Sequence, residues 1–307
     1  MNKVIAIVGP TAVGKTALAL ALARELDGEI ISCDSMQIYK HMDIGTAKPT
    51  KEEMEQIKHH LIDIKYPNED FSCADYALLA REAIDDIISR GKTPIFCGGT
   101  GLYLDSVIEI ESFSSGVKDE AYRLELEEYA RKNGNEALHA LLCEVDIESA
   151  NEIHANNVKR VIRALEIYKC TGKKKSVWDR ESKEITPPYD ATVFFLTASD
   201  RAVLVSRIEK RVDIMLEQGL LDEAKFLYEN GYLNEKYTSY AAIGYKELLP
   251  YLKEEDTLEN CVERLKISTR QYAKRQLTWF GRKENYHKIN VDEQNALDVA
   301  LEILRNK

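Results

Sequence analysis

The segment GPTAVGKT at residues 9–16 constrains this chain more than any other. It follows an apolar run at residues 4–8 and precedes an Ala/Leu-rich stretch at 17–26, so it matches the pattern G-x-x-x-x-G-K-[ST] between a predicted strand and a predicted helix. Such a loop binds phosphate oxygens through backbone N–H groups, a lysine and a helix N-terminus, and its last hydroxyl can hold magnesium. The candidate phosphate ligands are Gly9, Pro10, Thr11, Ala12, Val13, Gly14, Lys15 and Thr16.

Short apolar runs alternate with helix-type periodicity along most of the chain. The runs are nearly continuous in apolar residues, as expected for strands that are covered on both faces. This alternation predicts an α/β fold, a parallel sheet of the P-loop NTPase type flanked by helices. The expected strands are 4–8, 29–33, 93–97 and 192–196, and the expected helices include 15–27, 76–90 and 201–216.

A charged, helix-favouring block without a convincing strand interrupts this pattern between residues 113 and 189. Turn-rich segments, SFSSG at 112–116 and TPPY at 186–189, bound it and suit linkers. We therefore expect a catalytic core of residues 1–112 and 190–307 and an inserted all-helical domain of residues 113–189. The chain after residue 201 is again mostly helical, and three glycines there are expected to end helices, namely Gly219, Gly231 and Gly244.

Composition limits the cellular setting. The 307 residues contain no apolar run long enough to cross a bilayer, and the chain begins directly in a predicted strand rather than a signal peptide. We expect a cytoplasmic protein with no membrane partner. The six cysteines lack metal or redox spacing and are expected to be small core residues, namely Cys33, Cys73, Cys97, Cys143, Cys170 and Cys261.

The distribution of charge matters more than its sum. A net charge of −10 argues against nucleic-acid binding, but residues 159–175 hold seven basic residues and one acid, and residues 264–283 hold seven basic residues and none. Residues 119–152, in contrast, are rich in acids. A solvated helix face explains either basic run alone, whereas two such runs in an acidic protein favour a bound polyanion.

Polar residues follow the predicted strand at 29–33, at the sheet edge where ligands of open α/β folds bind. Asp34 is thereby placed beside the phosphate loop, where it could bind magnesium, accept a proton from a nucleophile or cap the next helix. Ser35 and Gln37 could bond a flat polar group such as a base.

Two further segments offer weaker signals. Gly98, Gly99 and Gly101 allow either a close approach of the backbone to a ligand or a tight turn without one. The adjacent His59 and His60 point in different directions and make a poor metal pair, so a structural or hydrogen-bonding role is expected.

Taken together, the motifs resemble those of one family, the tRNA dimethylallyltransferases or tRNA isopentenyltransferases, in their bacterial form. The resemblance extends over almost the whole chain. Its motifs occur in the family's order at residues 9–16, 34–39, 43–49, 59–63, 98–103, 157–166, 242–247 and 269–280.

This resemblance implies a reaction. Members transfer a dimethylallyl group from dimethylallyl diphosphate to N6 of adenosine 37 in tRNAs that read codons beginning with U, and release diphosphate. The phosphate loop would then hold the donor's diphosphate with Mg²⁺ rather than ATP, with Thr16 as the metal ligand and Arg211 reaching the diphosphate. Asp34 would be the general base for the weakly nucleophilic amine, beside Lys15 and Thr16.

The resemblance also implies the partners. The expected partner is the tRNA anticodon stem-loop, bound by a protein that is expected to be a monomer. The tRNA-binding residues carried over are Asp34, Ser35, Met36, Gln37, Thr100, Arg123, Lys159, Arg160, Val161, Ile162, Arg163, Gly244, Tyr245, Lys246, Lys274 and Arg275.

Two positions depart from the family pattern. Lys58 stands where the family usually has proline, and Gly281 interrupts the usual Trp-Leu-Arg ending, which puts the register of the last tRNA contact in question. Three other readings share the phosphate loop: a kinase for a small metabolite, an adenylate isopentenyltransferase that prenylates free AMP, and a non-catalytic RNA-binding nucleotide switch.

Overall fold

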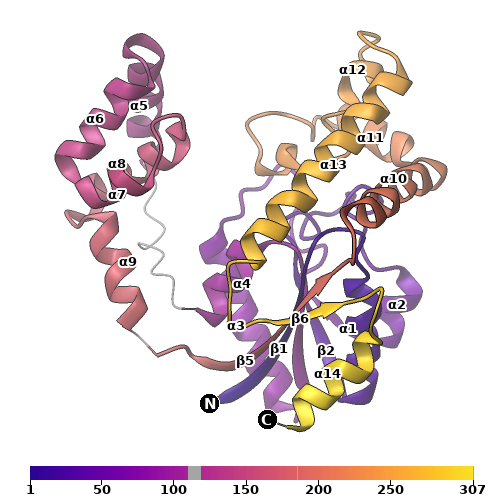
Figure 1. The fold of residues 1–307 in the computed structure, drawn as a ribbon. Helices are drawn as coiled ribbons and strands as arrows, with labels where there is room; N and C mark the ends of the chain where they lie inside the picture. Colours follow the sequence, from indigo (N-terminus) through magenta and orange to yellow (C-terminus); the bar gives the residue numbers. More distant parts are fainter. Residues whose placement is uncertain (110–118, 185, 307) are drawn as a thin grey trace. The chain divides into compact units, whose positions relative to one another are not determined.

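The chain forms two compact units (Figure 1). The computed structural model describes residues 1–109, 119–184 and 186–306. One unit comprises Met1–Ile108 and Tyr189–Lys307, and the other is Glu109–Pro188. The expected division lay at residues 112 and 189, and the linker expected at 112–116 falls outside the described residues.

The first unit is built on a six-stranded sheet in the order β3-β2-β4-β1-β5-β6, in which every pair is parallel. Val8 pairs with Gly98, and Cys33 pairs with Gly98 from the other side, so β1, β2 and β4 end at one edge. The predicted α/β class and all four predicted strands are confirmed. The strands are β1 (Asn2–Val8), β2 (Gly28–Cys33), β3 (His59–His60), β4 (Thr93–Gly98), β5 (Tyr189–Thr197) and β6 (His287–Asn290).

Helices cover both faces of this sheet, as the apolar strands require. Along β1, Val4, Ala6 and Val8 belong to one core, while Ile5 and Ile7 belong to a second core on the opposite face. The first core includes α3, α4, α11 and α13, and the second includes α1 and α14. The helices of this unit are α1 (Lys15–Glu25), α2 (Lys51–Gln56), α3 (Cys73–Ser89), α4 (Gly101–Ile108), α10 (Arg201–Glu217), α11 (Leu220–Glu229), α12 (Leu249–Leu252), α13 (Leu258–Phe280) and α14 (Ala296–Arg305), with a 3-10 turn at Thr238–Ala241.

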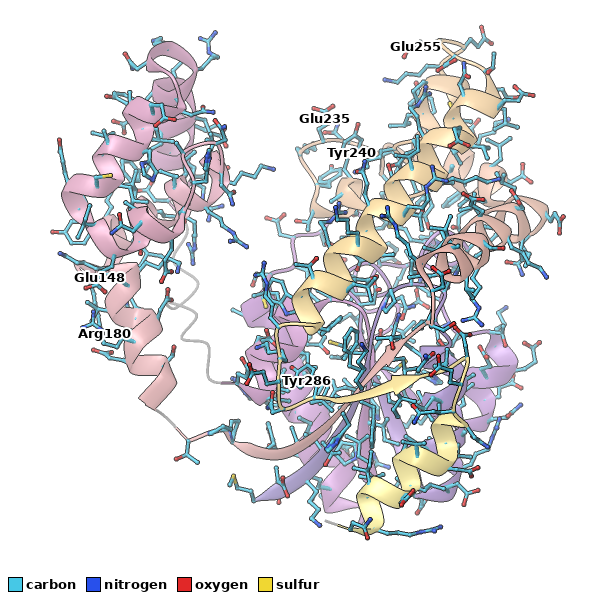
Figure 2. All side chains as sticks on the ribbon, in the orientation of Figure 1. Glu148, Arg180, Glu235, Tyr240, Glu255 and Tyr286 are labelled. Atoms are coloured by element: carbon cyan, nitrogen blue, oxygen red, sulfur yellow. The ribbon has the colours of Figure 1, made fainter. Side chains whose placement is uncertain are left out.

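Within residues 119–184 the second unit consists of helices joined by short turns, and no strand occurs among these residues. Its core contains Leu126, Leu138, Leu142, Val161 and Leu165, all of them buried. Arg180 and Glu148, labelled in Figure 2, form an ion pair of 2.7 Å between α9 and α7. The helices are α5 (Glu120–Asn133), α6 (Asn135–Val145), α7 (Ile147–Glu152), α8 (Val158–Thr171) and α9 (Lys175–Glu184).

A few expectations fail in detail. The edge strands β3 and β6 were not predicted, because two and four residues are too few to show a periodicity. Gly219 and Gly231 do flank α11 with positive φ, but Gly244 lies within a turn and ends no helix. Among the described helices none is long and apolar enough to span a bilayer. All six cysteines are free, and only Cys33 and Cys261 are fully buried.

Candidate active site

The phosphate loop joins β1 to α1 and adopts a conformation that requires its glycines. Gly9 has φ +145°, and a Cβ there would lie 2.5 Å from the Leu196 carbonyl oxygen. Gly14 has φ +97° and caps α1, whose first turn contains no acidic residue. The N-terminal amides of an eleven-residue helix therefore open the loop to an anion without a competing carboxylate.

Two cations converge on this loop from different helices. Lys15 Nζ donates to the Gly9 and Pro10 carbonyl oxygens at 3.1 and 2.8 Å. Arg211, on α10, donates from Nη1 to Thr11 Oγ1 at 3.0 Å. Burial lowers the pKa of Lys15 to about 8 and also lowers the pKa of Arg211, because few opposite charges compensate the buried cations. An anionic ligand would supply that compensation.

Asp34 lies where β2 ends. Its Oδ1 accepts a hydrogen bond from the Met36 N–H at 2.9 Å. Burial raises the pKa of this carboxyl group, although the Met36 N–H and the charges of Lys15 and Arg211 oppose the rise. The helix-capping alternative is excluded, because the next helix, α2, begins only at Lys51.

Two cavities adjoin at Asp34. A cavity of about 170 Å³ surrounds the phosphate loop, and we call it the phosphate chamber. A cavity of about 300 Å³, the adjoining chamber, has a wall of apolar side chains that includes Met36, Val212, Met215 and Leu265. Six residues line both: Thr11, Asp34, Thr46, Ala47, Arg211 and Tyr272. The carboxylate of Asp34 and the guanidinium of Arg211 thus lie between the phosphate loop and a larger, more apolar space.

Sequence reasoning missed two residues of α13 that line these chambers. Tyr272 lines both, and burial raises the pKa of its phenol, which stays neutral. Gln276 lines the phosphate chamber and accepts a hydrogen bond from the Thr11 N–H at 2.8 Å. The signal that could have found them is their spacing with Thr269, which places positions 269, 272 and 276 on one helix face.

In the glycine-rich segment after β4, two of the three glycines allow the close approach of side chains from α13. A Cβ on Gly99 would lie 1.9 Å from Gln276 Nε2, and one on Gly101 would lie 2.2 Å from the Trp279 ring. Only Gly98 reaches the phosphate chamber. Thr100 Oγ1 accepts from the Ser35 N–H at 3.0 Å and fixes the segment after β2.

The role expected for Gln37 needs correction. Its Nε2 donates to the Thr46 and Ala47 carbonyl oxygens at 3.2 and 3.1 Å, and its Oε1 accepts from Ser32 Oγ at 2.8 Å. Both amide hydrogens are therefore engaged within the protein and are not available to a base. Gln37 holds the segment at 46–47 that lines both chambers.

Gly244 and Tyr245 also differ from expectation, because both are buried. The Tyr245 hydroxyl donates to Glu223 at 2.8 Å, and the same carboxylate accepts from the N–H groups of Asp43, Ile44 and Gly45. These two residues therefore shape the site from within and offer no side chain to tRNA. Lys246, the third member of the predicted group, lines the adjoining chamber.

Four of the seven cations of the second basic run pair with carboxylates, and three of those carboxylates are distant in sequence. Arg264 pairs with Asp256 at 2.6 Å, Lys266 with Asp213 at 2.7 Å, and Arg270 with Glu209. Lys274 and Arg275 are exposed and, among the residues that the structure describes, no carboxylate lies in ion-pair range of either. Arg275 lines the adjoining chamber.

The first basic run, at residues 159–175 of the helical unit, also contains both paired and exposed cations. Arg123 and Arg163 both bind the fully buried Glu166, at 2.7 and 2.6 Å. Burial opposes ionisation of Glu166, but the two guanidinium groups keep its pKa below the ordinary value. Val161 and Ile162 lie in the core of the unit, so a contact of their side chains with tRNA is excluded. Lys159 and Arg160 are exposed.

The two histidines have structural partners, as expected. His60 Nε2 lies 2.7 Å from Glu29 Oε2, and His59 Nδ1 lies 2.7 Å from the Ile57 carbonyl oxygen. The ligand atoms of three side chains lie close enough together to hold a metal ion, namely those of Glu29, His60 and Asp86. Arg90 takes the place of such an ion, because it donates hydrogen bonds to both carboxylates.

The phosphate chamber offers the chemistry that Mg²⁺ requires. Thr16 and Asp34 both line it and present a hydroxyl and a carboxylate oxygen, and Mg²⁺ prefers oxygen ligands shared with substrate phosphates and water. The residues present therefore fit the predicted ion, with Thr16 as the protein ligand proposed from the sequence.

Comparison of the sequence with known proteins shows its family. A model of the IPP transferase family matches residues 37–284. The tRNA dimethylallyltransferase of Acetivibrio thermocellus is 51% identical over 99% of this chain and 97% of its own length. The chain belongs to this family. The tRNA dimethylallyltransferase of Bacillus cytotoxicus is 52% identical over 100% of this chain and 96% of its own length.

Solved structures of similar transferases have the same fold. The tRNA isopentenylpyrophosphate transferase of Bacillus halodurans superposes with a TM-score of 0.73 at 47% identity, covering 99% of this chain and 95% of that one. A eukaryotic dimethylallyltransferase described as acting on tRNA gives a TM-score of 0.87 at 34% identity, covering 100% of this chain and 80% of that one.

Proposed function

We propose that this protein transfers the dimethylallyl group of dimethylallyl diphosphate to N6 of adenosine 37 in tRNAs that read codons beginning with U. The products are N6-dimethylallyladenosine and diphosphate. The observation that carries the proposal is the pair of chambers that adjoin at Asp34, one with a phosphate loop and the other with an apolar wall. Membership of the tRNA dimethylallyltransferase family supports it.

The phosphate chamber would hold the donor. The amides of the phosphate loop, Lys15 and Arg211 surround the diphosphate, on which negative charge grows as the bond between the allylic C1 and oxygen breaks. Oriented dipoles and cations in a site that excludes water stabilise such a leaving group strongly. Mg²⁺ bound at Thr16 would supply further positive charge to the same oxygens.

The adjoining chamber would hold the base. Its apolar wall suits the faces of a purine, and the cost of unstacking the base, a few kcal/mol, is smallest in a single-stranded loop. Asp34 would accept a proton from the N6 amine as the new N6–C1 bond forms. Because burial raises its pKa, Asp34 is a stronger base than an aspartate in water.

Exposed cations would bind the tRNA backbone. Lys159 and Arg160 on the helical unit and Lys274 and Arg275 on α13 are exposed cations, and these four would contact the phosphates. Such contacts supply most of the affinity, while recognition of a loop depends on its shape and its unstacked bases. We further propose that the partner is the anticodon stem-loop, that the protein acts as a monomer and that it works in the cytoplasm.

The difference between exposed and paired cations predicts how each affects the salt dependence of tRNA binding. The double variant Lys159→Ala/Arg160→Ala is expected to reduce the slope of log Kobs for tRNA against log salt concentration by about 2, about one unit for each phosphate that is no longer neutralised. Filter binding at four salt concentrations measures the slope. Arg163 is left intact, because its removal would leave the buried Glu166 with an unbalanced charge.

A matched control removes the same charge elsewhere in the same unit. Arg131 and Lys132 on α5 both pair with Glu128, so the slope for Arg131→Ala/Lys132→Ala should stay near that of the unchanged protein. Equal slopes for the two double variants would contradict a direct phosphate role for Lys159 and Arg160.

One assay separates the proposed function from its rivals. Labelled dimethylallyl diphosphate and magnesium are incubated with unmodified tRNA, with AMP, or with neither, and a parallel reaction contains labelled ATP with small-molecule acceptors. We expect label from the prenyl donor in tRNA alone. Label in AMP would identify an adenylate isopentenyltransferase, and transfer of phosphate from ATP would identify a kinase.

A further inference from the structure

Gln276 connects two loops of the phosphate chamber to the helix that carries exposed cations. Its side chain is almost fully buried and makes two hydrogen bonds: Oε1 accepts from the Thr11 N–H at 2.8 Å, and Nε2 donates to the Gly99 carbonyl oxygen at 3.0 Å. One partner is a donor and the other an acceptor, so only an amide in this orientation satisfies both. Gly99 lacks a side chain at the point where this amide enters.

Thr11 is thereby held from two helices at once. Gln276 on α13 binds its backbone N–H, and Arg211 on α10 binds its hydroxyl. Thr11 also lines both chambers. A displacement of α13 therefore acts on the phosphate loop through a direct hydrogen bond, without an intervening flexible segment.

The C-terminal part of α13 has few ways to move independently of the site. Tyr272 lines both chambers one turn before Gln276, and Trp279 Nε1 donates to the buried Asp105 on α4 at 3.0 Å. Between these two aromatic residues lie Lys274 and Arg275, the exposed cations proposed to bind tRNA phosphates. The residue next to them in the chain is Gln276.

We propose that Gln276 is a positioning residue that couples tRNA binding on α13 to the affinity of the phosphate loop for the donor's diphosphate. It contacts neither reacting atom and acts through Thr11 and Gly99. The coupling is a free energy shared by the two sites, so tRNA tightens diphosphate binding by the same factor by which diphosphate tightens tRNA binding. This inference rests on the proposed function, since it requires both ligands.

The test replaces Gln276 with Met, which has a similar length but forms neither hydrogen bond. Calorimetry measures the Kd of inorganic diphosphate with magnesium, in the absence and in the presence of a saturating anticodon stem-loop RNA. In the unchanged protein we expect the RNA to lower this Kd by at least about fivefold, the lower end of typical coupling. In Gln276→Met the ratio of the two Kd values should fall close to one.

The ratio distinguishes coupling from simple damage, because a merely weakened phosphate loop raises both Kd values together and leaves the ratio unchanged. Gln271, an exposed glutamine on the same helix, provides the matched control, and Gln271→Met should keep the ratio of the unchanged protein. Gln276→Glu is a second variant, in case the Met side chain prevents folding. Its carboxylate can still accept from Thr11 but repels the Gly99 carbonyl, so its ratio should also fall.

Each outcome is decisive. A ratio near one in the unchanged protein, or an undiminished ratio in both Gln276 variants, would overturn the coupling role. If the unchanged protein transfers prenyl groups to tRNA in the same preparation, such a Kd ratio refutes the coupling role of Gln276 and leaves the proposed function intact. An unchanged protein that binds neither RNA nor diphosphate would instead overturn the proposed function.

Discussion

Replacing Asp34 with Asn is expected to lower kcat for prenyl transfer to tRNA by about 10²- to 10⁴-fold, the contribution typical of general base catalysis. The amide keeps the size of the side chain and an acceptor for the Met36 N–H, but it cannot take the proton of the exocyclic amine. Because the phosphate loop and the exposed cations are unchanged, the Kd for tRNA should stay close to its original value, and the Kd for diphosphate measured without magnesium should not rise. Single-turnover transfer and equilibrium binding measure the two quantities separately.

The control for Asp34 is Asp85, an exposed aspartate on the outer surface of α3. Asp85→Asn removes the same charge from the same unit and should leave kcat unchanged. A full rate of transfer in Asp34→Asn would contradict the base assignment. A loss of tRNA affinity in Asp34→Asn as large as the loss of kcat would show that Asp34 acts in tRNA recognition instead.

Replacing Lys15 with Met is expected to lower kcat/KM for dimethylallyl diphosphate by about 10²- to 10³-fold, the loss typical when one group that stabilises a developing anion is removed. The structure also predicts how KM for the donor depends on pH. The Lys15 pKa is lowered to about 8, so the ammonium form predominates below pH 8 and the neutral amine above it. Since diphosphate binds the ammonium form, KM for the donor should rise as pH increases through about 8.

The same rise should be absent in Lys15→Met, whose side chain does not titrate. Lys3→Met removes an exposed lysine at the start of β1 and serves as the control, with the pH profile of the unchanged protein. A KM that rises equally in Lys15→Met would assign the titration to another group. The measurement is a series of initial rates from pH 6.5 to pH 9.5 at saturating tRNA, a range chosen to span about 1.5 units on each side of the Lys15 pKa.

The central part of the fold follows from local sequence. The phosphate loop lies between an apolar run and a helix, and the four runs expected to form strands do form them, because a buried parallel strand needs nearly continuous apolar residues. The edge strand β3 could not be found in this way. It consists of His59 and His60, which join the sheet through pairing with Ile30 and Ile31 rather than through their own propensity.

The site was predictable where it depends on residues close in sequence, and less so where distant segments meet. Asp34 and Lys15 follow from strand ends and a motif. The engagement of Lys266 by Asp213 and of Arg270 by Glu209 depends on the packing of α13 against α10, so a basic run in the sequence overstates the charge left for tRNA. Gln276 was missed for the same reason, because its partners Thr11 and Gly99 are brought to it only by the fold.

The most direct test of the proposed reaction maps the product in tRNA. A tRNA that reads a codon beginning with U is transcribed without modifications, incubated with the protein, magnesium and dimethylallyl diphosphate, and digested for mass spectrometry. We expect one dimethylallyl group per molecule, on N6 of adenosine 37, and none in a tRNA with guanosine at that position. Prenylation elsewhere in the tRNA, or equal labelling of the variant tRNA, would contradict the proposed function.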